Sequence, residues 1–144
     1  ILAANNSVPY GRDPTTSWTV DNGTTWTFAY ATQGPGSNGG AVTFQTSDWK
    51  TWKKGPKPLT YSNFSGGWDC PDFFKLPFSE QKNGIEWVAK ASFKGRDWWA
   101  LGGYNSNTTE FIPYDGMTHN DAWNCDNCLW DYGSFYASKT FYDS

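Results

Sequence analysis

The chain has 144 residues, among them 10 Trp, 8 Tyr and 10 Phe, and its 11 Lys and Arg against 14 Asp and Glu give a formal net charge of −3. An acidic chain without a run of basic residues argues against nucleic acid or an anionic membrane as a partner, and the lack of about 18 consecutive apolar residues excludes a spanning helix. With 19% aromatic and 17% charged residues the composition excludes a disordered chain, and the length fits one domain.

The predicted elements are all β-strands. Short β-rich runs alternate with period two, most clearly Trp-Thr-Phe-Ala-Tyr at 26–30, and no window keeps the apolar spacing of a helix. Turn signals separate the runs, as at 21–23 and 82–84, and residues 46–52 suit a tight turn with a tryptophan over the sheet edge. We therefore predict an all-β chain of antiparallel hairpins. The expected strands, in chain order, are 16–20, 25–32, 41–46, 72–76, 87–92, 98–104 and 135–142.

Three segments open alike, each with an aspartate just before a strand-like run. These aspartates, Asp13, Asp69 and Asp131, are about 60 residues apart. Each interval has room for about three further strands, which is the content of one four-stranded propeller blade. Since the innermost strands of successive blades line a central channel, the spacing predicts that the three aspartates converge on one funnel. The alternative is that each is an ordinary turn residue before a strand.

Two or three blades cannot close a ring, because propellers have about four to eight blades. The chain begins at Ile1 without an initiator, contains a single methionine, Met117, and has no signal-peptide pattern. We therefore expect residues 1–144 to be part of a propeller domain from a longer protein.

The residues in the expected funnel suit glycoside hydrolysis. Two carboxylates facing one polar, aromatic-rimmed site can divide the work between a proton donor and an ionised group. Arg12 beside Asp13 can fork two hydrogen bonds to a sugar or hold a carboxylate. Indole rings offer flat faces and N–H donors to sugars, although most tryptophans in so short a chain must be blade core. The candidates for sugar contact are Trp68, Trp98, Trp99 and Trp130.

Three cysteines and one histidine raise the question of a metal. Cys125 and Cys128 have CxxC spacing, with His119 nearby, and zinc would need a further ligand such as Cys70. A local disulfide in a secreted chain, or two thiols in a loop, explains the spacing without a metal. We interpret His119 as a solvated loop residue, and the proposed chemistry requires no metal or organic cofactor.

Five segments resemble glycoside hydrolase family 32, the invertases and fructan hydrolases. They run in the family's order over nearly the whole chain, and the segments 12–18, 68–74 and 131–143 are specific only as a set. The segments are 12–18 (Arg-Asp-Pro-Thr-Thr-Ser-Trp), 68–74 (Trp-Asp-Cys-Pro-Asp-Phe-Phe), 87–92, 96–104 and 131–143.

The resemblance implies a five-bladed propeller, usually followed by a β-sandwich, and a retaining hydrolase that acts on β-fructofuranosyl bonds in sucrose or fructans. It makes Asp13 the transition-state stabiliser, assisted by Arg12, and places Asp69 at the acid/base position. It also makes Cys70 the cysteine beside the acid/base and Tyr132 an aromatic near the site. The family's nucleophile lies in an Asn-Asp-Pro segment that this sequence lacks, so we expect the chain alone to be inactive.

Two further departures from the family concern the acid/base position and the edge of the substrate site. Asp69 stands where the family has glutamate, and its carboxyl should sit on the order of 1 Å from the usual place, a displacement that can cost about 10²-fold in rate. Ser134 stands where many relatives have lysine, and residues 125–128 look like an insertion, which puts substrate length in doubt.

Alternative functions remain open at this stage. A fructosyltransferase uses the same scaffold with a sugar acceptor, and a carbohydrate-binding protein without catalysis would tolerate the aspartate at position 69. A sialidase-like propeller is disfavoured because the chain has only two arginines, Arg12 and Arg96. The resemblance implies an extracellular, cell-wall or vacuolar protein. Tripeptides of the Asn-x-Ser/Thr type suit a secretory route and begin at Asn5, Asn22, Asn63 and Asn107.

Overall fold

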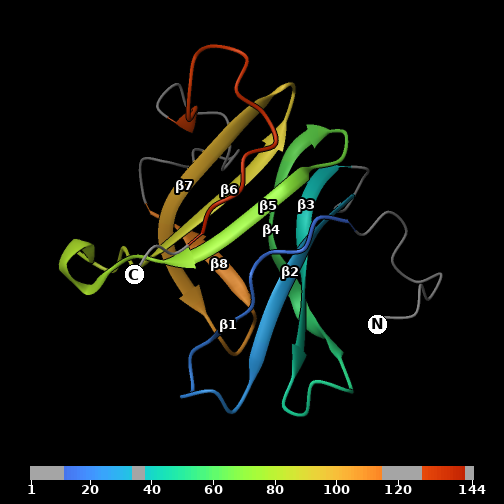
Figure 1. The fold of residues 1–144 in the computed structure, drawn as a ribbon, viewed down its shortest axis with the longest axis vertical. Helices are drawn as coiled ribbons and strands as arrows, with labels where there is room; N and C mark the ends of the chain where they lie inside the picture. The colour runs from blue at the N-terminus through green and yellow to red at the C-terminus, as the bar shows by residue number, and fades with distance from the viewer. Residues whose placement is uncertain (1–11, 34–37, 115–127, 142–144) are drawn as a thin grey trace.

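The computed structural model describes residues 12–33, 38–114 and 128–141, and strands dominate these ranges (Figure 1). A first sheet contains β1 (Trp18–Thr19), β2 (Trp26–Gln33), β3 (Asn38–Thr46) and β4 (Lys53–Ser65). A second sheet contains β5 (Asp69–Lys75), β6 (Trp87–Phe93), β7 (Arg96–Asn105) and β8 (Glu110–Pro113). A short 3₁₀ helix, η2 (Phe78–Glu80), joins β5 to β6. Among the residues placed, no helix has the length and apolar character needed to cross a membrane.

Both sheets are antiparallel meanders in which consecutive strands pair, with the orders β1-β2-β3-β4 and β5-β6-β7-β8. This confirms the prediction of four-stranded blades from the spacing of the aspartates. In each sheet the strand that follows the aspartate is an edge strand, as expected of the innermost strand of a blade. The two sheets are therefore two blades of a β-propeller.

The sequence did not predict the last strand of either blade. β4 contains Gly55, Pro56 and Pro58, and its pairing with β3 is irregular near Val42. Proline is tolerated in an edge strand because half of the backbone N–H groups of such a strand face away from the ladder and need no partner strand. Weak β signals are therefore compatible with outermost strands.

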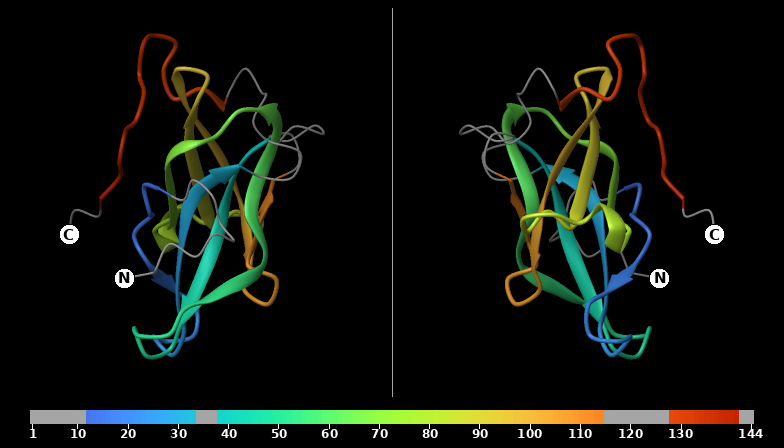
Figure 2. Two further views of the ribbon diagram at one scale, coloured as in Figure 1. Left: turned by 90° about the vertical axis from the view of Figure 1, so that its right-hand side faces the viewer. Right: turned by 90° about the vertical axis from the view of Figure 1, so that its left-hand side faces the viewer.

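Two expected strands differ from the structure. Only Trp18–Thr19 of 16–20 is regular strand, although Thr15 still donates its backbone N–H to Ala29 O at 2.8 Å. The prediction of a strand at 135–142 was wrong for the described residues, 135–141, because they form no β-ladder with any strand. Backbone amides of this segment donate instead to buried carboxylates, as when Thr140 N donates to Asp72 Oδ2 at 2.6 Å. Figure 2 shows the segment 128–141 (red) lying along the outside of the fold.

The core forms where the two blades face each other. Small residues on facing strands, such as Ala29 and Ala91, are fully buried and let the sheets approach. Large rings fill the remaining space: the centroids of Phe73 and Trp87 are 4.7 Å apart, as are those of Trp18 and Phe73. These aromatic rings therefore pack one blade on the next.

One glycine allows a close approach between the blades. A Cβ on Gly55 would lie 2.0 Å from Thr43 Oγ1 and 2.5 Å from Thr109 Oγ1. Thr43 donates a buried hydrogen bond to Thr109 at 2.9 Å across the interface. We expect Gly55→Ala to lower the free energy of unfolding by about 1–3 kcal/mol, because overpacking displaces this bond.

Urea unfolding of the purified chain measures this effect. Gly67→Ala is the matched control, since a Cβ there meets nothing within 4 Å. Equal stability of the two variants would contradict the close approach.

Candidate active site

The starts of the two inner strands bring Asp13 and Asp69 together. Asp69 is the first residue of β5, and Asp13 lies just before β1. The Asp13 carboxylate accepts a hydrogen bond from the backbone N–H of Cys70 at 3.3 Å and lies 3.7 Å from the Cys70 thiol. Two carboxylates from successive blades thus share one end of the fold.

Arg12 and Tyr136 contact the Asp69 carboxylate from two sides. The Arg12 guanidinium forms an ion pair with Asp69 Oδ1, and its Nε lies 4.0 Å from Asp13 Oδ2. The Tyr136 hydroxyl donates a hydrogen bond to Asp69 Oδ2. Burial, together with the bond to Asp69, raises the pKa of Tyr136 to about 12. The phenol therefore remains a donor to Asp69 at any neutral pH.

The backbone of the site is strained. Asp13, Cys70 and Ala137 all have positive φ, at 53°, 41° and 61°, although none is glycine. Such conformations cost on the order of 1–3 kcal/mol each, persist only where the surroundings impose them, and cluster at functional sites. The pairing of β5 with β6 also shifts register between Asp69 and Asp72, and a bulge at a strand end re-aims the side chains beside it.

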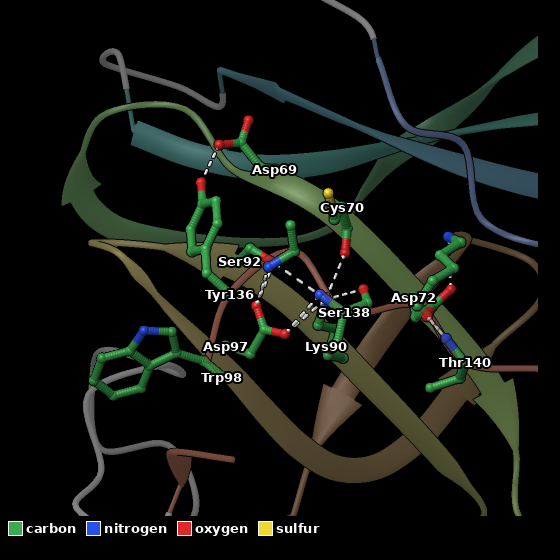
Figure 3. A network of polar contacts seen from close by, with 12 residues as sticks. Asp69, Cys70, Asp72, Lys90, Ser92, Asp97, Trp98, Tyr136, Ser138 and Thr140 are labelled. Carbon is green, nitrogen blue, oxygen red and sulfur yellow. Dashed lines mark hydrogen bonds and ion pairs between the residues drawn. The ribbon is translucent and has the colours of Figure 1, made fainter. Parts of the chain in front are cut away.

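A buried polar network lies beneath Asp69 and Cys70 (Figure 3). Lys90 and Asp97 have fully buried side chains and form an ion pair with Nζ 3.3 Å from Oδ2. Lys90 also donates to the carbonyls of Cys70 and Ser138, at 3.0 and 2.5 Å. Burial alone would raise the pKa of Asp97, but hydrogen bonds from Ser138 and Ser92 and the charge of Lys90 outweigh burial and lower that pKa.

A second ion pair links the segment 128–141 to residues beside Asp13 and Cys70. Lys139 Nζ lies 2.7 Å from Oδ1 of the buried Asp72. The same ammonium donates to the carbonyls of Pro14 and Pro71, at 3.1 and 2.9 Å. Lys139 therefore joins the residue after Asp13 to the residue after Cys70.

Trp68 does not face the candidate site. It is 3% exposed, its indole N–H donates to Ser62 Oγ at 3.2 Å, and its ring stacks on Phe93 at 5.7 Å. A ring packed in this way offers no face to a sugar, so the expectation of sugar contact is corrected to a core role. Trp98 also stacks on Phe93, at 5.1 Å, and donates to the Phe93 carbonyl.

The third aspartate behaves as a turn residue. Asp131 accepts a hydrogen bond from Gly133 N at 2.6 Å, which fits the alternative interpretation of an aspartate before a strand-like run. Tyr132 beside it is 71% exposed, and its carbonyl accepts a hydrogen bond from Arg96 at 2.8 Å. Trp130 is likewise exposed.

The cysteines fall into two groups. Cys70 is free, and burial followed by the nearby Asp13 charge raises the pKa of its thiol. Cys128 is buried and disulfide-bonded, while Cys125 and His119 lie outside the described residues. Within the ranges that are placed, no group of three His, Cys, Asp or Glu could hold a metal ion.

Sequence reasoning assigned no role to Tyr136, Lys90 or Asp97. Tyr136 lies 67 residues from Asp69, and only the fold brings them together. A clearer signal existed for Lys90, which interrupts the otherwise uncharged strand 87–93. A charge at such a position is buried only with a counter-charge and hydrogen bonds, and this requirement points to an acid on a neighbouring strand.

Comparison with known proteins identifies the family. The model of the glycosyl hydrolases family 32 N-terminal domain matches residues 2–144. The chain is 32% identical to β-fructofuranosidase, insoluble isoenzyme CWINV6, of Arabidopsis thaliana over 100% of this chain and 27% of that protein. It is 34% identical to β-fructofuranosidase, insoluble isoenzyme 1, of Oryza sativa subsp. indica over 92% of this chain and 23% of the relative.

Solved structures agree with this result. Fructan 1-exohydrolase IIa from Cichorium intybus matches with a TM-score of 0.76 and 32% identity, over 96% of this chain and 27% of that one. A variant of that enzyme in complex with 1-kestose matches with a TM-score of 0.74 and 33% identity, over 92% and 26%. The chain thus spans about a quarter of the length of its relatives. It belongs to glycosyl hydrolases family 32, within the N-terminal domain.

Proposed function

We propose that the protein containing this chain hydrolyses β-fructofuranosyl bonds of sucrose or fructans with retention of configuration. The observation that carries the proposal is the convergence of Asp13 and Asp69 from two successive inner strands. The relatives support the substrate class, being β-fructofuranosidases and a fructan exohydrolase.

In this mechanism Asp69 protonates the leaving-group oxygen and later takes a proton from water. Asp13 accepts hydrogen bonds from hydroxyls of the fructosyl ring as positive charge develops on it. Arg12 and Tyr136 hold the two oxygens of Asp69, and one of these contacts must open for proton transfer. The nucleophile would come from an Asn-Asp-Pro segment, which this sequence does not contain. We therefore propose that residues 1–144 are a catalytic portion of the propeller domain that cannot form the covalent intermediate alone.

A secretory route is part of the proposal. The disulfide at Cys128 is typical of oxidising compartments, and the curated relatives are described as insoluble isoenzymes. We propose an extracellular protein of the cell wall, or a vacuolar one.

Two alternatives use the same site. Asp69 in place of the family's glutamate favours a carbohydrate-binding protein without catalysis, because the shorter side chain is already held at both oxygens. A fructosyltransferase would differ in the acceptor alone.

Product analysis of the full-length protein with sucrose and with 1-kestose separates these functions. We expect free fructose from the full-length protein, and none from the 144-residue chain. Longer oligosaccharides at high sucrose would indicate a transferase. Binding without turnover, converted to turnover by Asp69→Glu, would establish a binding protein and overturn the proposal.

A further inference from the structure

One row of polar side chains crosses the second blade from the candidate active site. In the strand register Asp69 lies opposite Ser92, and Ser92 lies opposite Asp97, so the three side chains share one face of the sheet. Lys90 precedes Ser92 by two positions on β6 and lies on the same face. This face is covered by the segment that carries Tyr136, as the contacts drawn in Figure 3 show.

The Lys90–Asp97 pair is not explained by stability alone. Both side chains are fully buried, and two charges lose their hydration when they leave water. A well-packed apolar pair of similar volume stabilises a fold equally well or better. The charges do something that an apolar pair cannot do, which is to bind the backbone.

Lys90 binds carbonyls and Asp97 binds amides. The ammonium donates to Cys70 O at 3.0 Å and to Ser138 O at 2.5 Å. The carboxylate accepts from Ala137 N at 3.1 Å and from Ser138 N at 3.0 Å. Together the two side chains hold the bulge at the start of β5 against the segment 128–141, which covers this face of the blade.

Ser92 completes the unit. Its hydroxyl donates to Asp97 Oδ1, accepts from Lys90 Nζ at 3.1 Å and accepts from Ala137 N at 3.2 Å. All the hydrogen-bonding capacity of the hydroxyl is thus used inside the network.

The network binds the backbone of Cys70 and Ala137, which are next in sequence to the two residues of the Asp69–Tyr136 hydrogen bond. Cys70 follows Asp69, and Ala137 follows Tyr136. Both have positive φ, a conformation that persists in non-glycine residues only where the surroundings impose it. Loss of the network would let both peptides relax and would separate the Tyr136 hydroxyl from Asp69.

We propose that Lys90, Ser92 and Asp97 are a positioning unit that holds Tyr136 in hydrogen-bond contact with Asp69. This inference rests on the proposed function in one respect, which is that Asp69 acts as the proton donor. The contact itself is a property of the fold and can be measured without substrate.

The test uses a variant that removes both charges. Lys90→Met/Asp97→Asn leaves no unpaired buried charge, yet it removes the donor to Cys70 O and Ser138 O. The matched control is Lys75→Met/Glu86→Gln, which removes an exposed ion pair of 3.3 Å from the same sheet. Ser92→Ala is a milder second variant that serves if the double variant does not fold.

Carbon-13 NMR of ring-labelled tyrosines, assigned with Tyr136→Phe, reports the Tyr136 pKa in the full-length protein. We expect about 12 in the wild type and in the control, and a fall toward 10.0 by at least about one unit in the double variant and in Ser92→Ala. An unchanged Tyr136 pKa in a folded variant of either kind overturns the proposal.

Activity provides the second readout. In the same variants we expect the basic limb of the kcat/KM pH profile, which reports loss of the proton from the general acid, to move, whereas the control keeps the wild-type profile. A wild type that turns over no fructoside would refute the proposed function, and the Tyr136 titration would still decide the positioning role. A pH profile that stays at the wild-type position while the Tyr136 pKa falls would overturn the link between the contact and proton transfer.

Discussion

Asp69→Asn in the full-length protein is expected to lower kcat for sucrose by about 10²–10⁴-fold, which is the usual contribution of a general acid. The amide keeps the size of the side chain but delivers no proton to the leaving oxygen. Arg12 and Tyr136 still surround the position, so KM should change much less than kcat. Steady-state release of fructose measures both parameters.

A substrate with an activated leaving group provides an internal check on this prediction. Such a fructoside needs little protonation to depart, so Asp69→Asn should lower its kcat/KM, which reports formation of the covalent intermediate, far less than that of sucrose. Asp21→Asn is the matched control, because Asp21 accepts hydrogen bonds from Thr19 and Thr25 in the exposed β1–β2 turn. An equal loss of kcat/KM with both substrates would show that Asp69 acts in some way other than proton donation.

Lys90→Met is expected to lower the free energy of unfolding by about 3–5 kcal/mol, because it leaves Asp97 buried without its counter-charge. The double variant Lys90→Met/Asp97→Asn should recover much of this loss, since no unpaired charge remains. Urea unfolding of Lys90→Met, of Asp97→Asn and of the double variant gives the coupling energy between the two residues.

The control for this prediction is Lys75→Met. Lys75 forms an ion pair with Glu86 on the same sheet, but both side chains are about half exposed, at 52% and 46%. Its loss should cost no more than about 1 kcal/mol. Comparable losses for Lys75→Met and Lys90→Met would mean that the Lys90–Asp97 pair contributes no more than a surface pair.

The sequence predicted strands correctly where one face of the strand is buried and the other is not. Residues 25–32 alternate because Ala29 and Ala31 face the second blade, and the structure places β2 there. β4 escaped prediction because an edge strand with Pro56 and Pro58 has neither alternation nor a full ladder to maintain.

The segment 135–142 shows the opposite error. Phe135, Tyr136 and Phe141 give it strand-like composition, yet its described residues, 135–141, form hydrogen bonds to side chains and no strand ladder. Its amides bind Asp97 and Asp72, two acids separated from it by tens of residues. No local pattern reports such partners, because the carboxylates come together only after the second blade has formed.

In the candidate site, the sequence predicted the two aspartates but not the residues that contact and support them. The spacing of Asp13 and Asp69 follows from the blade repeat, and a repeat is visible in a sequence. Tyr136 and the Lys90–Asp97 pair depend on the register of β5, β6 and β7, which fixes which side chains are opposite. Trp68 was misjudged because an aromatic beside a motif residue reads equally well as core or as a sugar platform, and burial alone decides between them.

A crystal structure of full-length Asp69→Asn with 1-kestose tests the central claim, that Asp13 and Asp69 form a fructoside-cleaving site. We expect the terminal fructosyl ring beside this pair, with its hydroxyls within hydrogen-bond distance of Asp13 and the glycosidic oxygen facing residue 69. A sugar bound elsewhere on the protein, with Arg12, Asp13 and residue 69 making no contact with it, would contradict the claim.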